Sequence, residues 1–213
     1  MWGVRIWNAK GSLSIGDDAS SYVLRHKVAT ATNTSSPFFG GSFVIVTLAG
    51  ESPVAFMSCA QQGVNSNTVN NGDGTWTFAF WVNAPLGTAT TIYVFDLAHT
   101  VPTPWAWGFE IYKSPGVKAW FLGSKPLIIR RFGTDGTSLP SGRTYAGRTS
   151  RLGGYGNTFQ YNFLNYVSTF KADANGCSMG SPLWNSGSNP AGSPFGSWSS
   201  PGGAVIWIDV TGY

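Results

Sequence analysis

The sequence has few charged residues and little of what most enzymes use for catalysis. Only 10% of its 213 residues are Asp, Glu, Lys or Arg, and two are histidine. Ordinary soluble domains are about 25% charged. A surface this weakly charged is typical of secreted binding modules and of subunits that bury much of their surface against partners. The hydrophobic content of 42% excludes an intrinsically disordered chain.

Cysteine is nearly absent as well. Cys59 and Cys177 are the only two in the sequence, which excludes a disulfide framework. With two distant histidines they also leave no metal-ligand spacing. No apolar run approaches the ~18 residues of a membrane span, and no basic-then-apolar leader opens the sequence. We therefore expect a protein that is made in the cytoplasm, binds no cofactor or metal and spans no membrane.

The residues that remain do not form a complete catalytic set. Residues 176–180 (GCSMG) match the G-x-S-x-G nucleophile elbow, but a Gly/Pro-rich segment follows and no histidine occurs beyond His99. The order His26, Asp96, Ser178 is that of a chymotrypsin-like triad, but an arginine replaces His26 in the repeat described next. Several of the nine acids lie in predicted turns, where carboxylates mostly bond the local backbone. We expect no enzymatic activity.

The chain contains an internal repeat. Residues 2–26 (WGVRIWNAKGSLSIGDDASSYVLRH) align without a gap on residues 107–131 (WGFEIYKSPGVKAWFLGSKPLIIRR). Both copies alternate apolar and other residues with a period of two, turn at a glycine and end in a further apolar run. The identical pairs are Trp2/Trp107, Gly3/Gly108, Ile6/Ile111, Gly11/Gly116 and Arg25/Arg130. The repeat predicts an all-β fold of antiparallel, β-sandwich-like modules, with a three-strand meander present twice (residues 2–26 and 107–131).

The stretch between the copies predicts further strands. Residues 75–82 alternate cleanly, and residues 91–97 return after a turn as their antiparallel hairpin partner. Residues 61–74 are rich in Asn and Gly and predict a polar loop. The stiff segment 101–104 (VPTP) marks a boundary. It divides the chain into an N-terminal module, 1–104 (meander plus hairpin), and a C-terminal module, 105–213, or else the two merge into one domain.

A long loop is predicted near the end of the chain. Of the 32 residues from 172 to 203, 22 are Gly, Ser, Pro or Asn. This segment carries three large aromatic residues, Trp184, Phe195 and Trp198. They either pin the loop to the sheet beneath it or form an exposed surface that meets a partner subunit or a saccharide.

Arginines concentrate just after the second copy of the repeat. Between residues 130 and 151 the only acid is Asp135, and the five arginines are Arg130, Arg131, Arg143, Arg148 and Arg151. Either this is a solvated basic loop region, or it contacts anionic groups such as a phosphate-bearing surface glycolipid or an acidic partner subunit. No recognition helix or stacking motif accompanies the arginines, so nucleic acid is not expected as a partner.

Two short motifs resemble a known family. The opening WGVRIWNAKG (residues 2–11), its second copy, and RTYA (143–146) with Gly153-Gly154 after it are similar to minor tail proteins at the tail tip of long-tailed, siphovirus-type bacteriophages. The resemblance implies a non-enzymatic structural subunit of the tail tip, or distal baseplate, located in the virion and present in multiple copies. Its partners would be other tail-tip proteins, with a host surface glycan or receptor as a further contact.

A second hypothesis comes from the tryptophans. A carbohydrate-binding β-sandwich module would stack sugar rings on exposed Trp side chains, chosen from Trp2, Trp107, Trp184 and Trp198. Trp2 and Trp107 occupy the same position in the repeat, which favours a packing role for these two.

Overall fold

Strands make up almost all of the regular structure in this computed structural model, which describes residues 3–8, 11–16, 21–36, 40–103, 110–113, 116–133, 139–151, 154–159, 162–188, 198–200 and 203–213. All strand pairs among these residues are antiparallel. The predicted all-β, antiparallel fold is confirmed. The one helical element in the described part is a 3-10 turn, η1 (Ala98–Thr100). No helix there is long and apolar enough to cross a membrane.

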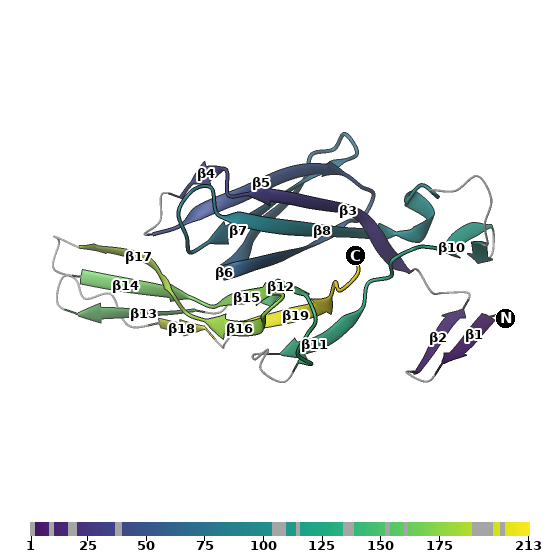
Figure 1. Ribbon diagram of the computed structural model, residues 1–213. Helices are drawn as coiled ribbons and strands as arrows, with labels where there is room; N and C mark the ends of the chain where they lie inside the picture. Colours follow the sequence, from purple (N-terminus) through teal and green to yellow (C-terminus); the bar gives the residue numbers. More distant parts are fainter. Residues whose placement is uncertain are drawn as a thin grey trace.

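The strands are numbered along the chain (Figure 1). Those before residue 104 are β1 Gly3–Asn8, β2 Gly11–Gly16, β3 Tyr22–Ala31, β4 Thr34–Ser35, β5 Ser42–Ala49, β6 Val54–Asn70, β7 Thr75–Val82 and β8 Ala89–Leu97. Those after it are β9 Glu110–Lys113, β10 Val117–Phe121, β11 Ile129–Gly133, β12 Tyr145–Arg151, β13 Gly154–Phe159, β14 Asn162–Val167, β15 Thr169–Asp173, β16 Gly176–Gly180, β17 Leu183–Ser188, β18 Trp198–Ser200 and β19 Ala204–Asp209.

Six strands of the large sheet curl into a small, partly open barrel. In the order β3, β8, β6, β12, β19, β11, each pairs with the next. Residues 125–127, just before β11, return to β3: the Leu24 amide donates to the Lys125 carbonyl, and the Leu127 amide donates to the Tyr22 carbonyl. The interior holds Tyr22, Leu24, Val54, Phe56, Tyr93, Phe95, Leu127, Ala146, Ile206, Ile208, Val210 and Tyr213.

A second core lies on the outer face of this barrel, under a layer made by β5, β7, β15 and the second half of β6. Strand β6 belongs to both layers because it is 17 residues long. Its residues 54–58 pair with β8 in the barrel, and its residues 63–70 pair with β7 in the layer. The side chains between barrel and layer include Val44, Met57, Phe78, Phe80, Val94, Tyr145, Phe170, Ala172, Val205 and Trp207.

The sequence repeat belongs to a larger structural duplication. The third strand of the first copy, β3, pairs with β8, and the third strand of the second copy, β11, pairs with β19. The two pairings have the same register: Leu24 lies opposite Phe95, and Ile129 lies opposite Ile208. Both registers then shift at the arginine that the copies share, Arg25 or Arg130. The partner strands β8 and β19 pair in turn with β6 and β12, which pair with each other. The barrel therefore consists of two halves, β3–β8–β6 and β11–β19–β12, related by an approximate two-fold axis.

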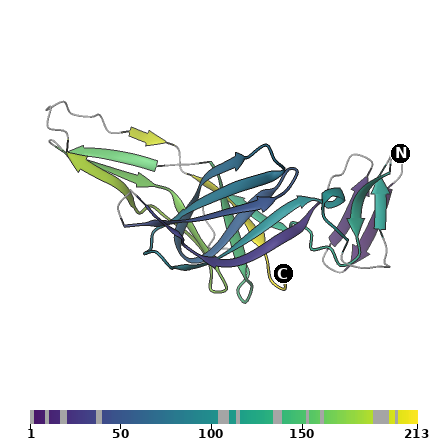
Figure 2. The ribbon, with the colours of Figure 1, turned by 90° about the horizontal axis from the view of Figure 1, so that it is seen from above.

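The predicted three-strand meanders need one correction. β1 pairs with β2 and β9 with β10, and within the described residues neither hairpin has a further strand partner. Both hairpins lie at the same end of the molecule (Figures 1 and 2). The third strand leaves them for the barrel because Val23 is fully buried on one face and Tyr22 and Leu24 pack into the interior on the other. A two-stranded hairpin cannot cover both faces.

The predicted hairpin of residues 75–82 and 91–97 is wrong in its pairing. Both segments are strands, but β7 pairs with β5 and β6, whereas β8 pairs with β3 and β6. Residues 61–70, predicted as loop, are the second half of β6 and take the position beside β7. Gly63 allows this close approach, since a Cβ there would lie 2.8 Å from the Trp81 carbonyl oxygen.

The predicted loop 172–203 also contains strands, namely the end of β15 and all of β16, β17 and β18. Asp173 closes the turn between β15 and β16, because its Oδ1 accepts the Asn175 amide at 2.7 Å. Small residues help β16 to pack: a Cβ on Gly180 would lie 2.9 Å from the Gln62 side chain. The abundance of Gly and Ser therefore reflects close packing and tight turns as well as loop.

Strands from before and after residue 104 share the large sheet, since β6 pairs with both β12 and β15. The two predicted modules thus have a common core. A separate four-stranded sheet, in the order β17, β14, β13, β18, extends away from the barrel as an arm (Figures 1 and 2).

We expect Gly147→Ala to lower the free energy of unfolding by about 1–3 kcal/mol. Gly147 lies where β12 meets β6, and a Cβ there would come within 2.7 Å of the Phe170 ring and 3.2 Å of the Trp207 ring. Phe170, which packs edge-on against Trp207, would have to move. Urea denaturation measures the change. The matched control is Gly133→Ala, whose Cβ would have only the Arg131 side chain nearby, at 3.7 Å. Equal losses in both variants would contradict this explanation.

Candidate functional site

Each copy of the repeat places its arginine on a buried aspartate. Arg25 Nη1 lies 3.0 Å from Asp96 Oδ2, and Arg130 Nη2 lies 3.0 Å from Asp209 Oδ2. The aspartate side chains are 0% and 4% exposed. Both arginines stand at the register shift of their strand. A buried carboxylate is tolerated only when it is paired and hydrogen-bonded, so each pair fixes the third strand of its copy to the next strand of the barrel.

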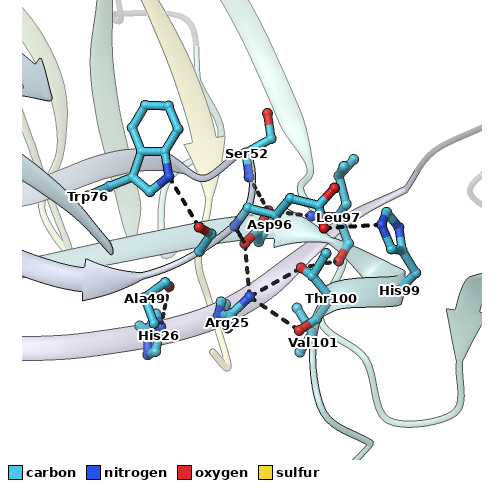
Figure 3. A network of polar contacts seen from close by, with 12 residues as sticks. Arg25, His26, Ala49, Ser52, Trp76, Asp96, Leu97, His99, Thr100 and Val101 are labelled. Atoms are coloured by element: carbon cyan, nitrogen blue, oxygen red, sulfur yellow. Dashed lines mark hydrogen bonds and ion pairs between the residues drawn. The ribbon is translucent and has the colours of Figure 1, made fainter. Parts of the chain in front are cut away.

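The first of these sites is closed (Figure 3). Asp96 Oδ2 accepts Arg25 and the Glu51 amide, and Asp96 Oδ1 accepts the Ser52 and Leu97 amides, at 2.9 to 3.1 Å. Arg25 Nη1 also bonds the carbonyl and hydroxyl of Thr100, both at 3.2 Å. Both carboxylate oxygens are satisfied inside the protein, so this site has a structural role.

The second site is open. Asp209 Oδ2 accepts Nε and Nη2 of Arg130 and also Nη1 of a second arginine, Arg143. The two arginine side chains are 39% and 34% exposed. A pocket of about 260 Å³ lies beside them, and Lys125 and Tyr213 also line it. Asp96 accepts three backbone amides, whereas Asp209 accepts one, from Thr211 to Oδ1 at 3.0 Å, and has a second cation and access to solvent.

Asp209 and Tyr213, which line this pocket, each have a single protonation state near neutral pH. Burial by itself would raise the pKa of Asp209, but hydrogen bonds from Thr211, Arg143 and Arg130 outweigh it, and the pKa lies below its ordinary value. Burial, with a contribution from Asp209, raises the pKa of Tyr213 to about 12. The aspartate is thus ionised and the tyrosine protonated, and the side chains that line the pocket include three cations, Lys125, Arg130 and Arg143, and one carboxylate.

The five arginines predicted as one interaction surface separate in the structure. Arg130 and Arg143 converge on Asp209, whereas Arg131 is half-buried and does not line the pocket. Arg148 is half-buried in β12, with Nη1 3.5 Å from the Ala55 carbonyl oxygen, and burial lowers its pKa. Arg151 ends β12, but its side chain lies outside the described residues.

The predicted aromatic surface falls largely outside what the structure describes. Trp184 belongs to β17 and Trp198 to β18, both in the arm, but their side chains are outside the described residues. Phe195 is outside them altogether. Both roles considered for these aromatic residues, pinning the segment to the sheet and forming an exposed contact surface, therefore stay predictions.

Sequence reasoning missed Asp209, Lys125 and Tyr213. A signal for Asp209 was available: residues 92–97 (IYVFDL) and 205–210 (VIWIDV) are both apolar runs with an aspartate at the fifth position. They form the equivalent strands β8 and β19. Extending the repeat to its partner strands would have found the aspartate.

The residues of the chymotrypsin-like order do not meet. Asp96 is held by Arg25, His26 Nε2 lies 3.0 Å from the Ala49 carbonyl oxygen, and the Ser178 hydroxyl accepts from Gln62 Nε2 at 3.5 Å. In the described part of the chain no three His, Cys, Asp or Glu residues gather as a metal site. Comparisons with protein-family models, curated proteins and solved structures found no match.

We expect Arg25→Met to lower the free energy of unfolding by about 3–5 kcal/mol, because it leaves the Asp96 carboxylate buried without its cation. Chemical denaturation measures the loss. Glu51→Gln is the control: this side chain is 60% exposed and pairs only with His99 in the described structure, at 3.4 Å, so its loss should stay below about 1 kcal/mol. A loss of control size in Arg25→Met would show that the pair does not fix β3.

The Asp209 site predicts a pH dependence. Its folded pKa lies below the unfolded value of about 3.9. The stabilisation by the ionised carboxylate is therefore complete above that value and is lost as the pH falls through the folded pKa. The difference in unfolding free energy between the natural protein and Asp209→Asn should be constant from about pH 5 to 7 and shrink below about pH 4. A difference that persists unchanged in acid would contradict the assignment.

Proposed function

We propose that this protein is a non-enzymatic structural subunit that is held in a larger assembly by the outer edge of β11. One observation carries the proposal. β11 is an edge strand, since β19 is its only strand partner among the described residues, and it exposes Ile129 (57%) and Phe132 (66%) to solvent. Long apolar side chains on an open edge are a template for pairing with another chain, and soluble monomers avoid them.

Comparison with the other half of the barrel supports the outer edge of β11 as the contact. In β3 the position equivalent to Ile129 is Leu24, which packs into the barrel interior, and the position equivalent to Phe132 is Lys27. Residues 125–127 also bond the outer edge of β3 at its start. The two edges are built on the same plan, yet only β11 combines an open edge with exposed apolar side chains.

Further surfaces of the molecule suit an assembly. No charged residue occurs in β5, in β7 or in residues 61–70 of β6, and this face exposes Ile45 and Val69. The four-stranded arm extends beyond the barrel (Figure 2). Weakly charged surfaces are characteristic of buried interface cores, and an extended arm offers additional edges for neighbours.

The resemblance of the two repeat copies to siphovirus tail-tip proteins supports a bacteriophage tail as the assembly in question. We take the tail tip, or distal baseplate, of a bacteriophage as the location, with several copies per particle and other tail-tip proteins as neighbours. A tail-tip position would also bring the protein close to a glycan or receptor on the host surface. The resemblance is the support for these finer statements.

We expect the natural chain to self-associate, or to form a complex when it is co-expressed with the products of the adjacent genes. Phe132→Lys gives β11 the residue that β3 has at the equivalent position, and it should weaken that association at least tenfold, about 1.4 kcal/mol. Analytical ultracentrifugation measures self-association, and co-purification measures the complex.

The control is Leu86→Lys, a substitution of a similarly exposed apolar residue (57%) in the turn between β7 and β8, which should leave association unchanged. A natural chain that stays monomeric alone and binds none of the adjacent gene products would overturn the proposal. So would a Phe132→Lys variant that associates as the natural chain does.

A further inference from the structure

We propose that the pocket beside Asp209 binds a small phosphate monoester. The pocket is lined by Lys125, Arg130, Arg143 and Asp209 on its charged side, with Ile128 and Tyr213 among its apolar residues. The inference does not depend on the proposed assembly, because it rests on the charges and hydrogen bonds of this pocket alone.

Among the described residues, the second arginine has no cationic counterpart on the aspartate of the first half. In the first half, Arg25 and backbone amides satisfy Asp96 with no other cation on it. In the second half, Arg130 gives Asp209 Oδ2 two hydrogen bonds, the Thr211 amide donates to Oδ1 at 3.0 Å, and Arg143 adds a third hydrogen bond to Oδ2. A second cation that the first half lacks, placed at an open pocket, points to a ligand.

Donors remain available on these cations. Arg143 uses only Nη1 within the described structure, and Arg130 uses Nε and Nη2. A guanidinium has five N–H groups in a fixed plane, an arrangement that suits phosphate oxygens. Lys125 is held in place because its Nζ donates to the Gly212 carbonyl at 2.8 Å and lies 5.6 Å above the Tyr213 ring. An ammonium in this position keeps two further N–H groups.

The balance of charge favours a dianion. Among the side chains that line the pocket, three are cations and one is a carboxylate that is ionised near neutral pH. The surplus is two positive charges, and a phosphate monoester carries about −1.5 to −2 at neutral pH. A carboxylate ligand would leave one positive charge uncompensated.

The size of the pocket limits the ligand. Its volume of about 260 Å³ is several times the share of one water molecule in the liquid, about 30 Å³, and lies just below the range of drug-sized sites. It has room for a phosphate group and for part of a small group such as a sugar ring, which would rest against Ile128 and Tyr213. A phosphorylated sugar is therefore the ligand class that the pocket fits.

Isothermal titration calorimetry at low salt tests this with glucose 1-phosphate, inorganic phosphate, glucuronate and glucose as probes. Glucose 1-phosphate should bind more tightly than the other three. Its affinity should also rise as the pH increases through about 6, where the second phosphate proton is lost. If inorganic phosphate binds as tightly as glucose 1-phosphate, the ligand need not be a monoester and the proposal is wrong. If glucuronate binds as tightly, the preference for a dianion is wrong.

Two variants and a control identify the site. Arg143→Gln leaves the Arg130–Asp209 pair in place and should weaken glucose 1-phosphate binding at least tenfold, since it removes charge-assisted hydrogen bonds to the phosphate. Lys125→Gln should also weaken it, by several-fold. Arg131→Gln removes the same charge one residue from Arg130 but outside the pocket lining, and should change the affinity less than twofold. Thermal unfolding checks that all three variants are folded. Binding unchanged in both Arg143→Gln and Lys125→Gln, or reduced equally in the control, would overturn the proposal.

Discussion

The structure depends on the way β6 pairs along its whole length. Its first half completes the barrel between β8 and β12, and its second half carries the layer that covers the outer core. The contact of Met57 with Gly147 joins the two halves of the barrel. Around it pack Phe170 and Trp207, edge to face at 5.9 Å. Because Gly63 and Gly147 have no Cβ, neighbouring chains and rings approach closely there. Without this strand, one half of the barrel would be the two-stranded sheet β3–β8 and the other would be the separate three-stranded sheet β11–β19–β12, and each alone is too small to bury a core.

The two halves of the barrel keep their buried contacts and differ in what they expose. Both have an arginine at the register shift and a buried aspartate on the adjacent strand. In one half the aspartate is enclosed by backbone amides, and in the other it borders a basic pocket. A duplicated scaffold of this kind supplies its own internal comparison: a charge or an apolar side chain present in only one half is not required by the fold. This comparison separates Arg143 and Phe132 from the structural residues around them.

The strands could be predicted from the sequence better than their partners. Alternation marked residues 75–82 correctly, because Phe78 and Phe80 on one face of β7 are fully buried, whereas Thr77 and Ala79 on the other are only partly buried; Trp81 on that second face is buried as well. The same pattern cannot say which edge meets which neighbour, and β6 rather than β8 lies beside β7. Residues 61–70 were predicted as loop because Asn and Gly are poor strand formers, but backbone pairing with β7 along residues 63–70, and with β15 at Gly63, outweighs that preference. Of the five arginines, Arg130 and Arg143 belong to one site. The aspartate that joins them, Asp209, lies 66 residues from Arg143 in the sequence, and local sequence patterns do not detect a contact over that separation.

The outer edges of β3 and β11 differ, and this difference limits how many molecules can add to one another through them. If β3 and β11 were equally free and apolar, each molecule could pair with two neighbours, and repetition of that contact would produce an open-ended fibre. The start of β3 is occupied by residues 125–127 of the same chain, and the exposed Lys27 follows further along it. Of these two barrel edges, only β11 remains suited to strand addition, so a row built through the barrel edges alone ends after a single addition. In the proposed assembly, the asymmetry that leaves β11 open to a partner would also keep any row built through the barrel edges finite.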